Sequence, residues 1–454
     1  MIQVINPATG EHLRTYDELS PEKVSEIIDD VNEAWYSWKE VSFDERAAHM
    51  MELSRLIKKD KERLARLMTE EMGKVYSQGI SEAEKCAWVC EYYAQNAQEF
   101  LKNEPKESDA SNSYVAFRPL GLVLAIMPWN FPFWQVMRFA APALMAGNVG
   151  ILKHASNVPG CAAAIEELIK RAGFPENVFR NLHVGSDQIE DIIANEKVKA
   201  VTLTGSTPAG KSVAAYAGKN LKKTVLELGG SDPYIILEDA DLDLAIEKCV
   251  TSRLINNGQS CIAAKRFIVV ESIADEFEKR MVEAMEAKNM GDPELEGTDL
   301  GPMSRKDLRE ELHEQVKESV EKGAKLLLGG EIPESDGFFY PATILTNVPK
   351  AAPAYSQELF GPVASIIRVQ DLEKAIEVAN DTEFGLGAGI FTKDEEKGRE
   401  IAETRLEAGC CFVNDFVKSD PRLPFGGIKG SGYGRELSSF GIREFVNTKT
   451  VYVA

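Results

Sequence analysis

The chain has 454 residues, enough for about three domains of roughly 150 residues each. Its 52 Lys and Arg residues are outnumbered by 72 Asp and Glu residues, and the net charge of −20 argues against nucleic-acid binding, which requires clustered positive charge. A hydrophobic content of 44% with 27% charged residues is typical of a globular protein and excludes a disordered one.

Neither a membrane segment nor a metal site is expected. The most apolar stretch, residues 120–137, contains Pro128, Asn130 and Pro132, which oppose a spanning helix. The first residues, MIQVINPATGEH, lack the basic and apolar regions of a signal peptide. The seven cysteines and five histidines show no metal-ligand spacing, and the odd, sparse cysteines favour the reducing cytoplasm.

The first hundred residues have helical periodicity. A helix start at 20–22 is followed by apolar residues at helical spacing, and further helices are predicted over 42–74 and 80–101. Two short strand-like runs come next, at 114–117 and 122–126. A proline and a glycine separate them, which indicates either a hairpin or two separate strands.

From residue 149 onward, strand-like and helical segments alternate. Strands are predicted at 149–152, 199–204, 225–228, 234–237, 267–270, 325–328, 364–369, 388–392, 411–414 and 445–453. Helices are predicted at 161–172, 209–220, 242–256, 273–288, 305–322, 371–380 and 394–407. This alternation predicts an α/β fold with mostly parallel sheets covered by helices.

The segment INNGQSC places Cys261 on a tight turn after a predicted helix. A turn exposes the sulfur, and nearby N–H groups favour its reactive thiolate. Taken alone, the segment is better explained by a buried structural cysteine. The other six cysteines lie in apolar patterns and are interpreted as core residues.

Three further segments follow predicted strands, where α/β proteins bind ligands. In LELGGSDP, desolvation of Glu227 would raise its pKa toward that of a general base; the alternative is an acid bridged to a lysine. In PWNFP, Asn130 is an oxyanion donor or part of a rigid turn. In TGSTPAG, Gly205, Ser206 and Gly210 suit a phosphate site at a helix start, although no GxGxxG motif is present.

Together these segments resemble the aldehyde dehydrogenase superfamily, and the resemblance spans essentially the whole chain. It begins at NPATGE (6–11), includes LKHAS, QELFGPV and NDTEFGL, and ends at PFGGIKGSGYGRE (424–436). Cys261 follows Glu227 by 34 residues, the interval usual in the family. Within the family, the chain is most similar to the bacterial succinate-semialdehyde dehydrogenases.

The resemblance implies an aldehyde dehydrogenase-like α/β fold in three parts. A Rossmann-like cofactor-binding domain would comprise 1–103 and 123–228, and an α/β catalytic domain would comprise 229–428. A small β oligomerisation flap would combine 104–122 with 436–454. Because exposed strand edges invite pairing, a homodimer or homotetramer is expected.

The resemblance also assigns roles in aldehyde oxidation. Cys261 would attack the aldehyde carbon, and Asn130 with the Cys261 N–H would hold the oxyanion. After hydride transfer to the nicotinamide, Glu227 would activate the water that hydrolyses the thioester. Further residues would contact the cofactor: Trp129, Lys153, Gly205, Ser206, Gly210, Glu358 and Phe360.

Cofactor choice is expected to depend on Ser156, three residues after Lys153. NAD-using members often have glutamate there, which binds ribose hydroxyls and repels a 2′-phosphate. Serine beside lysine favours NADP, with NAD as the alternative. His154 is either a further donor or a neutral packed histidine.

Arg138, eight residues after Asn130, matches an arginine of semialdehyde dehydrogenases that would bind the substrate carboxylate. Its alternative is a surface salt bridge. Ser419 is the matching hydroxyl, whereas a second arginine of some members is replaced by Ile255. Trp134 and Phe425 are expected to line the aldehyde channel or to be core residues.

Three rival functions remain at this stage. A coenzyme-A-acylating enzyme would lack the deacylating acid, which is present here as Glu227. An inactive scaffold would not need an intact Cys261, and a thiol hydrolase acting on esters would leave the cofactor segments unexplained. Oxidation of a small-molecule aldehyde, most simply succinic semialdehyde, is therefore the expected activity.

Overall fold

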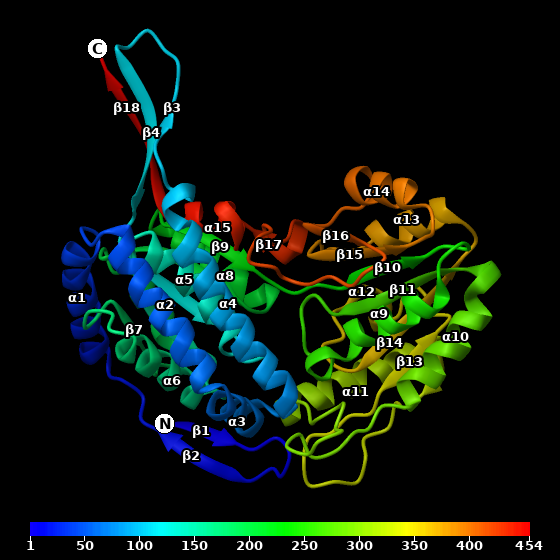
Figure 1. Cartoon of the computed structure of the whole chain (residues 1–454). Helices are drawn as coiled ribbons and strands as arrows, with labels where there is room; N and C mark the ends of the chain where they lie inside the picture. The colour runs from blue at the N-terminus through cyan, green and yellow to red at the C-terminus, as the bar shows by residue number, and fades with distance from the viewer.

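The computed structural model of residues 1–454 has two α/β lobes, each built on one sheet, and a β arm that projects from the first lobe (Figure 1). The N-terminus begins a two-stranded antiparallel sheet of β1 (Ile2–Ile5) and β2 (His12–Tyr16). These strands precede the first helix, so the prediction of a helical first hundred residues is wrong for residues 2–16.

The sheet of the first lobe has the order β17-β9-β8-β5-β6-β7 and is parallel except for β17. Its strands are β5 (Leu122–Met127), β6 (Val149–His154), β7 (Phe179–Asn181), β8 (Val198–Thr204), β9 (Lys223–Glu227) and β17 (Gly432–Tyr433). The chain goes from β5 to β6 and β7 on one side, then returns to β8 and β9 on the other. The carboxyl ends of β5 and β8 therefore flank a topological switch point, where such sheets bind ligands.

Helices cover this sheet on both faces (Figure 1). They are α1 (Pro21–Trp38), α2 (Phe43–Lys59), α3 (Lys61–Met72), α4 (Tyr76–Phe100), α5 (Trp134–Met145), α6 (Pro159–Arg171), α7 (Ile189–Ala194) and α8 (Thr207–Lys219). Ser20 and Ser42 cap α1 and α2, and Ser42 forms a capping box with Glu45. The helix predicted over 42–74 is interrupted at Asp60, where the backbone leaves the helical region.

The sheet of the second lobe has the order β12-β13-β14-β11-β10-β15-β16, with only β12 antiparallel. Its strands are β10 (Asp232–Ile236), β11 (Ala264–Val270), β12 (Lys325–Leu328), β13 (Thr343–Thr346), β14 (Val363–Val369), β15 (Gly387–Phe391) and β16 (Cys410–Val413). Its helices are α9 (Leu242–Leu254), α10 (Glu271–Glu286), α11 (Lys306–Glu321), α12 (Pro353–Ser356), α13 (Leu372–Asn380) and α14 (Glu395–Thr404). Nearly all of these elements were predicted by periodicity, with ends shifted by a few residues.

The arm is a three-stranded sheet of β3 (Glu104–Pro105), β4 (Asn112–Pro119) and β18 (Val446–Val453). Strand β18 follows α15 (Ser438–Glu444) and is the last element of the chain (Figure 1). Strand β18 pairs with β4 over its full length, whereas β5 pairs with β6 and β8. The strand-like runs at 114–117 and 122–126 are thus two separate strands of different sheets, not a hairpin.

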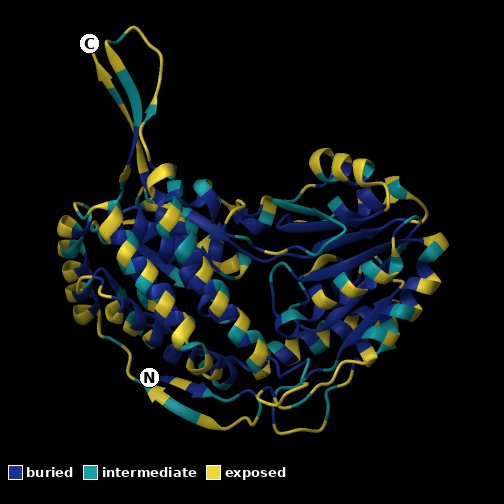
Figure 2. Cartoon of the chain, in the orientation of Figure 1, coloured by how far each residue is buried: buried dark blue, intermediate teal, exposed yellow.

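The strands of both large sheets are buried, whereas the arm is mostly exposed (Figure 2). Because helices cover both faces of each large sheet, most of its strands are near-continuous apolar runs. None of the helices combines the length and apolar character needed to cross a membrane.

Candidate active site

Cys261 follows a tight turn between α9 and β11. Asn256, Asn257 and Gly258 have left-handed φ angles of 54°, 57° and 75°, which asparagine and glycine tolerate best. A Cβ on Gly258 would lie 2.3 Å from the carbonyl carbon and oxygen of Gly361, so the two backbones touch. The tight turn predicted from INNG is confirmed.

Side chains of the turn connect both lobes. Asn257 donates from Nδ2 to the carbonyl oxygens of Gly73 (3.1 Å) and Pro302 (2.9 Å). Asn256 donates from Nδ2 to the carbonyl oxygen of Asn130 (2.8 Å). Because these amides are buried and hydrogen-bonded, they fix the position of the cysteine relative to the first lobe.

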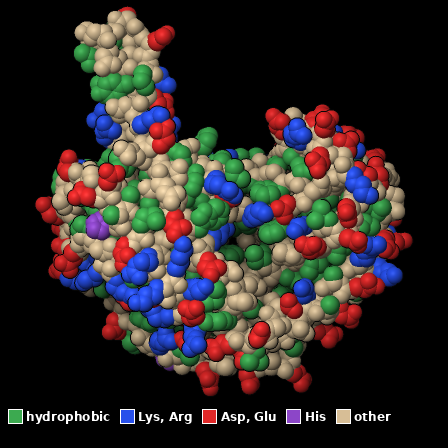
Figure 3. Space-filling model, viewed as in Figure 1, with side chains coloured by type: hydrophobic (Ala, Val, Ile, Leu, Met, Phe, Trp, Pro, Cys, Tyr) green, Lys and Arg blue, Asp and Glu red, His purple; other side chains and the backbone are tan.

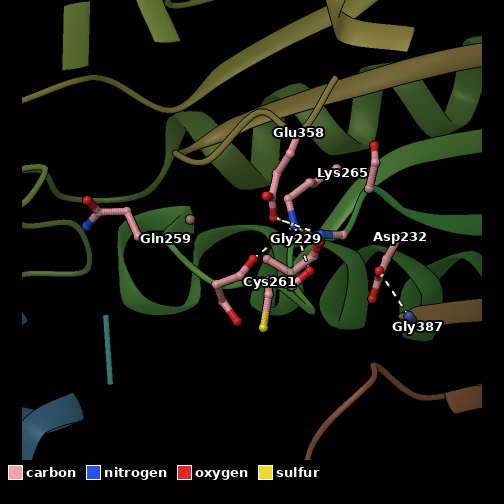
Figure 4. A network of polar contacts seen from close by, with 12 residues as sticks. Gly229, Asp232, Gln259, Cys261, Lys265, Glu358 and Gly387 are labelled. Carbon is pink, nitrogen blue, oxygen red and sulfur yellow. Dashed lines mark hydrogen bonds and ion pairs between the residues drawn. The ribbon is translucent and has the colours of Figure 1, made fainter. Parts of the chain in front are cut away.

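Lys265 supports the backbone of the cysteine, and no sequence pattern had pointed to it. Its Nζ donates to the carbonyl oxygens of Ser260 (2.9 Å) and Cys261 (2.8 Å), and it lies 3.3 Å from the Glu358 carboxylate (Figure 4). Burial lowers the pKa of Lys265, and Glu358 opposes this shift. A lysine inside an apolar strand such as β11 requires buried partners, which is the signal that could have identified it.

Cys261 lies where two cavities meet, in the region where Figure 3 shows the molecule hollowed between the lobes. The large cavity, about 520 Å³, is lined by Trp129, Gly205, Ser206, Glu358 and Phe360 among others. The small cavity, about 270 Å³, is lined by Lys85, Trp134, Arg138, Ser419 and Phe425 among others. Cys261 is the one residue that lines both.

Burial raises the pKa of the Cys261 thiol to about 12, although the positive charges of Arg138 and Lys265 act in the opposite direction. The sulfur points away from the Lys265–Glu358 pair (Figure 4). Desolvation thus opposes the thiolate that the turn is predicted to favour, whereas the two nearby positive charges support it.

Asn130 lies in the wall of the large cavity, near Cys261. Its Nδ2 donates to the carbonyl oxygen of Gln259 at 3.1 Å, and its Oδ1 has no hydrogen-bond partner. An amide nitrogen has two hydrogens, so this bond holds the side chain and leaves the second hydrogen for a ligand oxygen.

Glu227, at the end of β9, is buried and lines neither cavity. Both carboxyl oxygens lack a hydrogen-bond partner, and Oε1 lies against Gly426, where a Cβ would be 2.6 Å away. Burial raises the pKa of Glu227 well above its ordinary value, and Glu436 raises it further, whereas Arg138 lowers it. The predicted rise in pKa is thus present, and the alternative of a lysine bridge is wrong.

Arg138 lines the small cavity and forms a buried ion pair with Glu436. Its guanidinium also lies 4.8 Å from the centre of the Phe425 ring, and Nη2 is 3.5 Å from the Thr204 hydroxyl. The alternative of a surface salt bridge is wrong, because the pair is inside the protein. The ion pair nevertheless neutralises much of the positive charge that was expected to meet a substrate.

The large cavity extends over the carboxyl ends of β5 and β8, at the topological switch point. Trp129 follows β5, and its ring meets that of Phe360 edge-on at 5.8 Å. Gly205 and Ser206 follow β8, and Ser206 caps helix α8. Glu358 is held by Lys265 and by the N–H of Gly230 at 3.1 Å. The sequence-predicted cofactor residues of these segments therefore share one cavity.

Gly210 does not line this cavity, contrary to its predicted role. It is buried, and a Cβ there would lie 2.5 Å from the Leu228 side chain. Glycine is required at this position for the packing of α8 against the strand end, not for close approach to a ligand.

Lys153 and Ser156 lie at the end of β6, beside β5. Lys153 forms no ion pair, burial lowers its pKa, and Ser156 is exposed. His154 is buried: Nε2 donates to the carbonyl oxygen of Pro132 and Nδ1 accepts from the N–H of Ala155, both at 2.9 Å. Burial lowers the pKa of His154 to about 4, so it is the neutral packed histidine and not a donor to a phosphate.

The small cavity contains a lysine that the sequence analysis missed. Lys85, on α4, donates to the Ser419 hydroxyl at 2.9 Å and lies 4.3 Å from the centre of a Trp134 ring. It is spaced three residues from Glu82 and four from Val89, both buried. That helical spacing places Lys85 on the inward face and is the signal that could have identified it.

The family model described as the aldehyde dehydrogenase family matches residues 1–451. A Synechocystis protein named probable succinate-semialdehyde dehydrogenase (NADP+) is 50% identical over 453 residues, which cover 100% of both chains. A Mycobacterium tuberculosis protein named succinate-semialdehyde dehydrogenase (NADP+) 1 is 47% identical over 456 residues, again covering 100% of both.

Solved structures give the same result. The crystal structure of succinic semialdehyde dehydrogenase from Streptococcus pyogenes in complex with NADP+ has a TM-score of 0.98 and 40% sequence identity, with 100% of both chains covered. The full-length match extends to the arm as well as to both lobes.

Proposed function

The chain belongs to the aldehyde dehydrogenase family, and from this premise we propose that it oxidises succinic semialdehyde to succinate with NADP. The alternative is another short or carboxylated aldehyde with NAD. The observation that most supports the proposal is that Cys261 lines both the large and the small cavity, because a nucleophile between a cofactor site and a substrate site can meet both.

Three side chains perform the chemistry in this proposal. The Cys261 sulfur adds to the aldehyde carbon as its thiol proton leaves, and the free Asn130 amide hydrogen and the Cys261 N–H stabilise the oxyanion. A nicotinamide bound in the large cavity would supply the hydride acceptor. Cys261 is then acylated, and Glu227 takes a proton from the water that hydrolyses the thioester.

Glu227 must change its position and protonation for this role. Next to Gly426 it is buried without a hydrogen bond, and burial raises its pKa, which favours the protonated form. A rotation toward Cys261 would bring the carboxyl to solvent in the cavity, where it can ionise. In this proposal the carboxyl is uncharged while the oxyanion forms, so it does not repel the oxyanion, and it becomes a base only after the rotation.

The residues around the large cavity fit a dinucleotide. Helix α8 begins at Thr207 after its cap Ser206, and this helix start faces the cavity, where it suits a pyrophosphate. Glu358 suits the hydroxyls of the nicotinamide ribose, and Trp129 and Phe360 suit the ring. Lys153 and the exposed Ser156 lie outside the cavity lining, at the end of β6, which neighbours β5; Lys153 has no ion pair, and the two suit a 2′-phosphate and support NADP over NAD.

In the small cavity, Arg138, Ser419, Trp134 and Phe425 are proposed to contact the substrate. Arg138 retains donors beyond the one paired with Glu436, since a guanidinium has five N–H groups. Trp134 and Phe425 provide the apolar wall for a short methylene chain.

The test is a steady-state assay of the purified protein with succinic semialdehyde and either NADP or NAD. NADPH is followed by absorbance, and succinate is identified by mass. An uncharged aldehyde of equal chain length is the substrate control. Oxidation that requires coenzyme A, hydrolysis of an ester without cofactor turnover, or no reaction would instead favour the acylating enzyme, the thiol hydrolase or the scaffold.

We further propose that the arm joins copies of this chain in a homodimer or homotetramer. Strand β18 is an edge of the arm sheet, so its outer backbone groups are unpaired. Large exposed apolar side chains are concentrated in the same part of the chain: Leu423, Ile428, Tyr433, Phe440, Tyr452 and Val453. Light scattering on the intact protein tests this assembly.

The domain boundaries and the compartment are also proposals. The second sheet lies wholly within 229–428, and the arm strands lie within 104–122 and 436–454, which supports the three expected units. All seven cysteines are free, which supports a reducing cytoplasm. Limited proteolysis and cell fractionation test these two points.

A further inference from the structure

Four charged side chains line the small cavity: Glu82, Lys85, Arg138 and Lys418. Glu82 is ion-paired with Lys74, Arg138 with Glu436, and Lys418 with Asp415. Lys85 alone has no carboxylate partner. The cavity therefore has one uncompensated positive charge, and it comes from Lys85.

We propose that Lys85, together with Ser419, binds the distal carboxylate of the substrate and determines the selection of carboxylated aldehydes. This inference rests on the proposed function and adds to it the group that supplies the net charge. Glu436 then neutralises the charge of Arg138 at the cavity wall, and the remaining N–H groups of Arg138 contribute hydrogen bonds but little net charge.

The geometry around Lys85 suits a carboxylate. Its Nζ is 2.9 Å from the Ser419 hydroxyl, and this uses one of its three N–H donors. Trp134 is also buried in the cavity wall, and its indole N–H has no partner in the protein. A carboxylate accepts about four hydrogen bonds, so it can be bound by ammonium, hydroxyl and indole together.

The surroundings of Lys85 also explain why its charge is available. Burial lowers the pKa of Lys85, and Arg138 lowers it further, whereas Glu82 and Asp420 raise it weakly. Asp420 is occupied by Arg422 at 2.6 Å, and Glu82 by Lys74 and the N–H groups that begin α5. Lys85 is half-buried and has no carboxylate partner, so a carboxylate that enters the cavity can form an ion pair with it.

Apolar surroundings on the other side of the lysine strengthen this interaction. Lys85 packs over the face of Trp134 at 4.3 Å, a contact that orders the ammonium without neutralising it. Ile255 lines the same cavity and adds no charge to it.

The experiment compares Lys85→Met with the unchanged protein on succinic semialdehyde and on an uncharged aldehyde of equal length. We expect the ratio of the two kcat/KM values to fall by about 10- to 100-fold, mainly through the KM of succinic semialdehyde, because a charge-assisted bond is lost. Lys85→Arg should restore part of the ratio. Lys102→Met, which removes an exposed lysine beyond the same helix, is the matched control.

The outcomes separate this inference from the function on which it depends. If the unchanged protein prefers succinic semialdehyde and Lys85→Met keeps that preference, the role of Lys85 is overturned and the proposed function stands. If the unchanged protein shows no preference for the charged aldehyde, both are overturned. Should Lys85→Met not fold, as judged by circular dichroism and NADP binding, Lys85→Gln decides, because it keeps a polar side chain without the charge, and an unchanged ratio in that variant overturns the inference.

Discussion

Arg138, which lines the small cavity beside Cys261, forms a buried ion pair with Glu436, and both charges act on the carboxyl of Glu227. Arg138 lowers the pKa of Glu227 and Glu436 raises it. The pair therefore has two effects, since it keeps an arginine in the substrate cavity nearly neutral and it determines how readily the proposed base ionises.

Replacement of Glu436 by Gln should change both stability and pH dependence. An unpaired buried arginine remains, so the free energy of unfolding should fall by about 3–5 kcal/mol. Because a negative neighbour of Glu227 is lost, the pKa of Glu227 should fall, and the limb of the thioester-hydrolysis profile that rises with pH should move to lower pH. Denaturant unfolding and single-turnover kinetics measure the two effects, with the exposed Glu403→Gln as control. An unchanged profile would mean that Glu436 does not act on the base.

Replacement of Cys261 by Ala should abolish oxidation and leave NADP binding intact. The substitution removes only the sulfur, while the turn is held by Asn256, Asn257 and Lys265 through other groups. Binding is measured by calorimetry and turnover by NADPH absorbance. Oxidation that persists in this variant would contradict the covalent mechanism.

Replacement of Glu227 by Gln should give one burst of NADPH per active site, followed by a stall. Hydride transfer precedes hydrolysis, so the acylated Cys261 accumulates when the base is missing. Rapid mixing measures the burst, and mass spectrometry detects the acyl group. Steady turnover without a burst would assign the base to another residue.

Much of the fold follows from the sequence, because periodicity depends on local burial. The alternation of strands and helices after residue 149 predicted both large sheets and most of their helices. Pairing could not be predicted in the same way. Strand β4 pairs with β18 at the other end of the chain, and nothing local in 112–119 specifies that partner. The short strands β1, β2 and β7 have too few residues for a clear period.

The candidate site was predicted in its parts but not in its electrostatics. Motifs identified Cys261, Glu227 and Asn130, because each lies at a strand end or a turn with unusual residues. The sequence did not identify Lys85 or Lys265, because the partners of a lysine in a helix or strand come from elements that are distant in the sequence. The pairing of Arg138 with Glu436 depends on a contact between residues nearly three hundred positions apart.

The affinity for succinic semialdehyde should depend on pH through Lys85. Burial and Arg138 lower the pKa of Lys85 to about 8. Only the protonated lysine attracts a carboxylate, so the KM of succinic semialdehyde should rise as the pH increases through about 8. The KM of an uncharged aldehyde should not rise in this pH range. The KM of succinic semialdehyde should also stay constant with Lys85→Arg, because the guanidinium remains charged. If KM rises at the same pH for both aldehydes, another titrating group is responsible.

The choice between NADP and NAD should depend on Ser156, at the end of β6. Lys153 has no ion pair, and Ser156 is exposed beside it, so a 2′-phosphate finds positive charge and a hydroxyl donor. NADP should therefore be preferred. Because a carboxylate repels a phosphate and can accept from a ribose hydroxyl, Ser156→Glu should reduce the preference by about one to three decades.

The measurement is the ratio of the specificity constants for NADP and NAD in the unchanged protein and in Ser156→Glu. Ser156→Ala separates the two contributions, since it removes the hydroxyl without adding charge and should reduce the ratio by only about 2- to 10-fold, the effect of one hydrogen bond. Lys153→Met should lower the kcat/KM for NADP more than that for NAD. If the unchanged protein prefers NAD, or if Ser156→Glu leaves the ratio as it was, the cofactor assignment is wrong. Aldehyde oxidation by Cys261 would stand, because Lys153 and Ser156 line neither of the two cavities that meet at the cysteine.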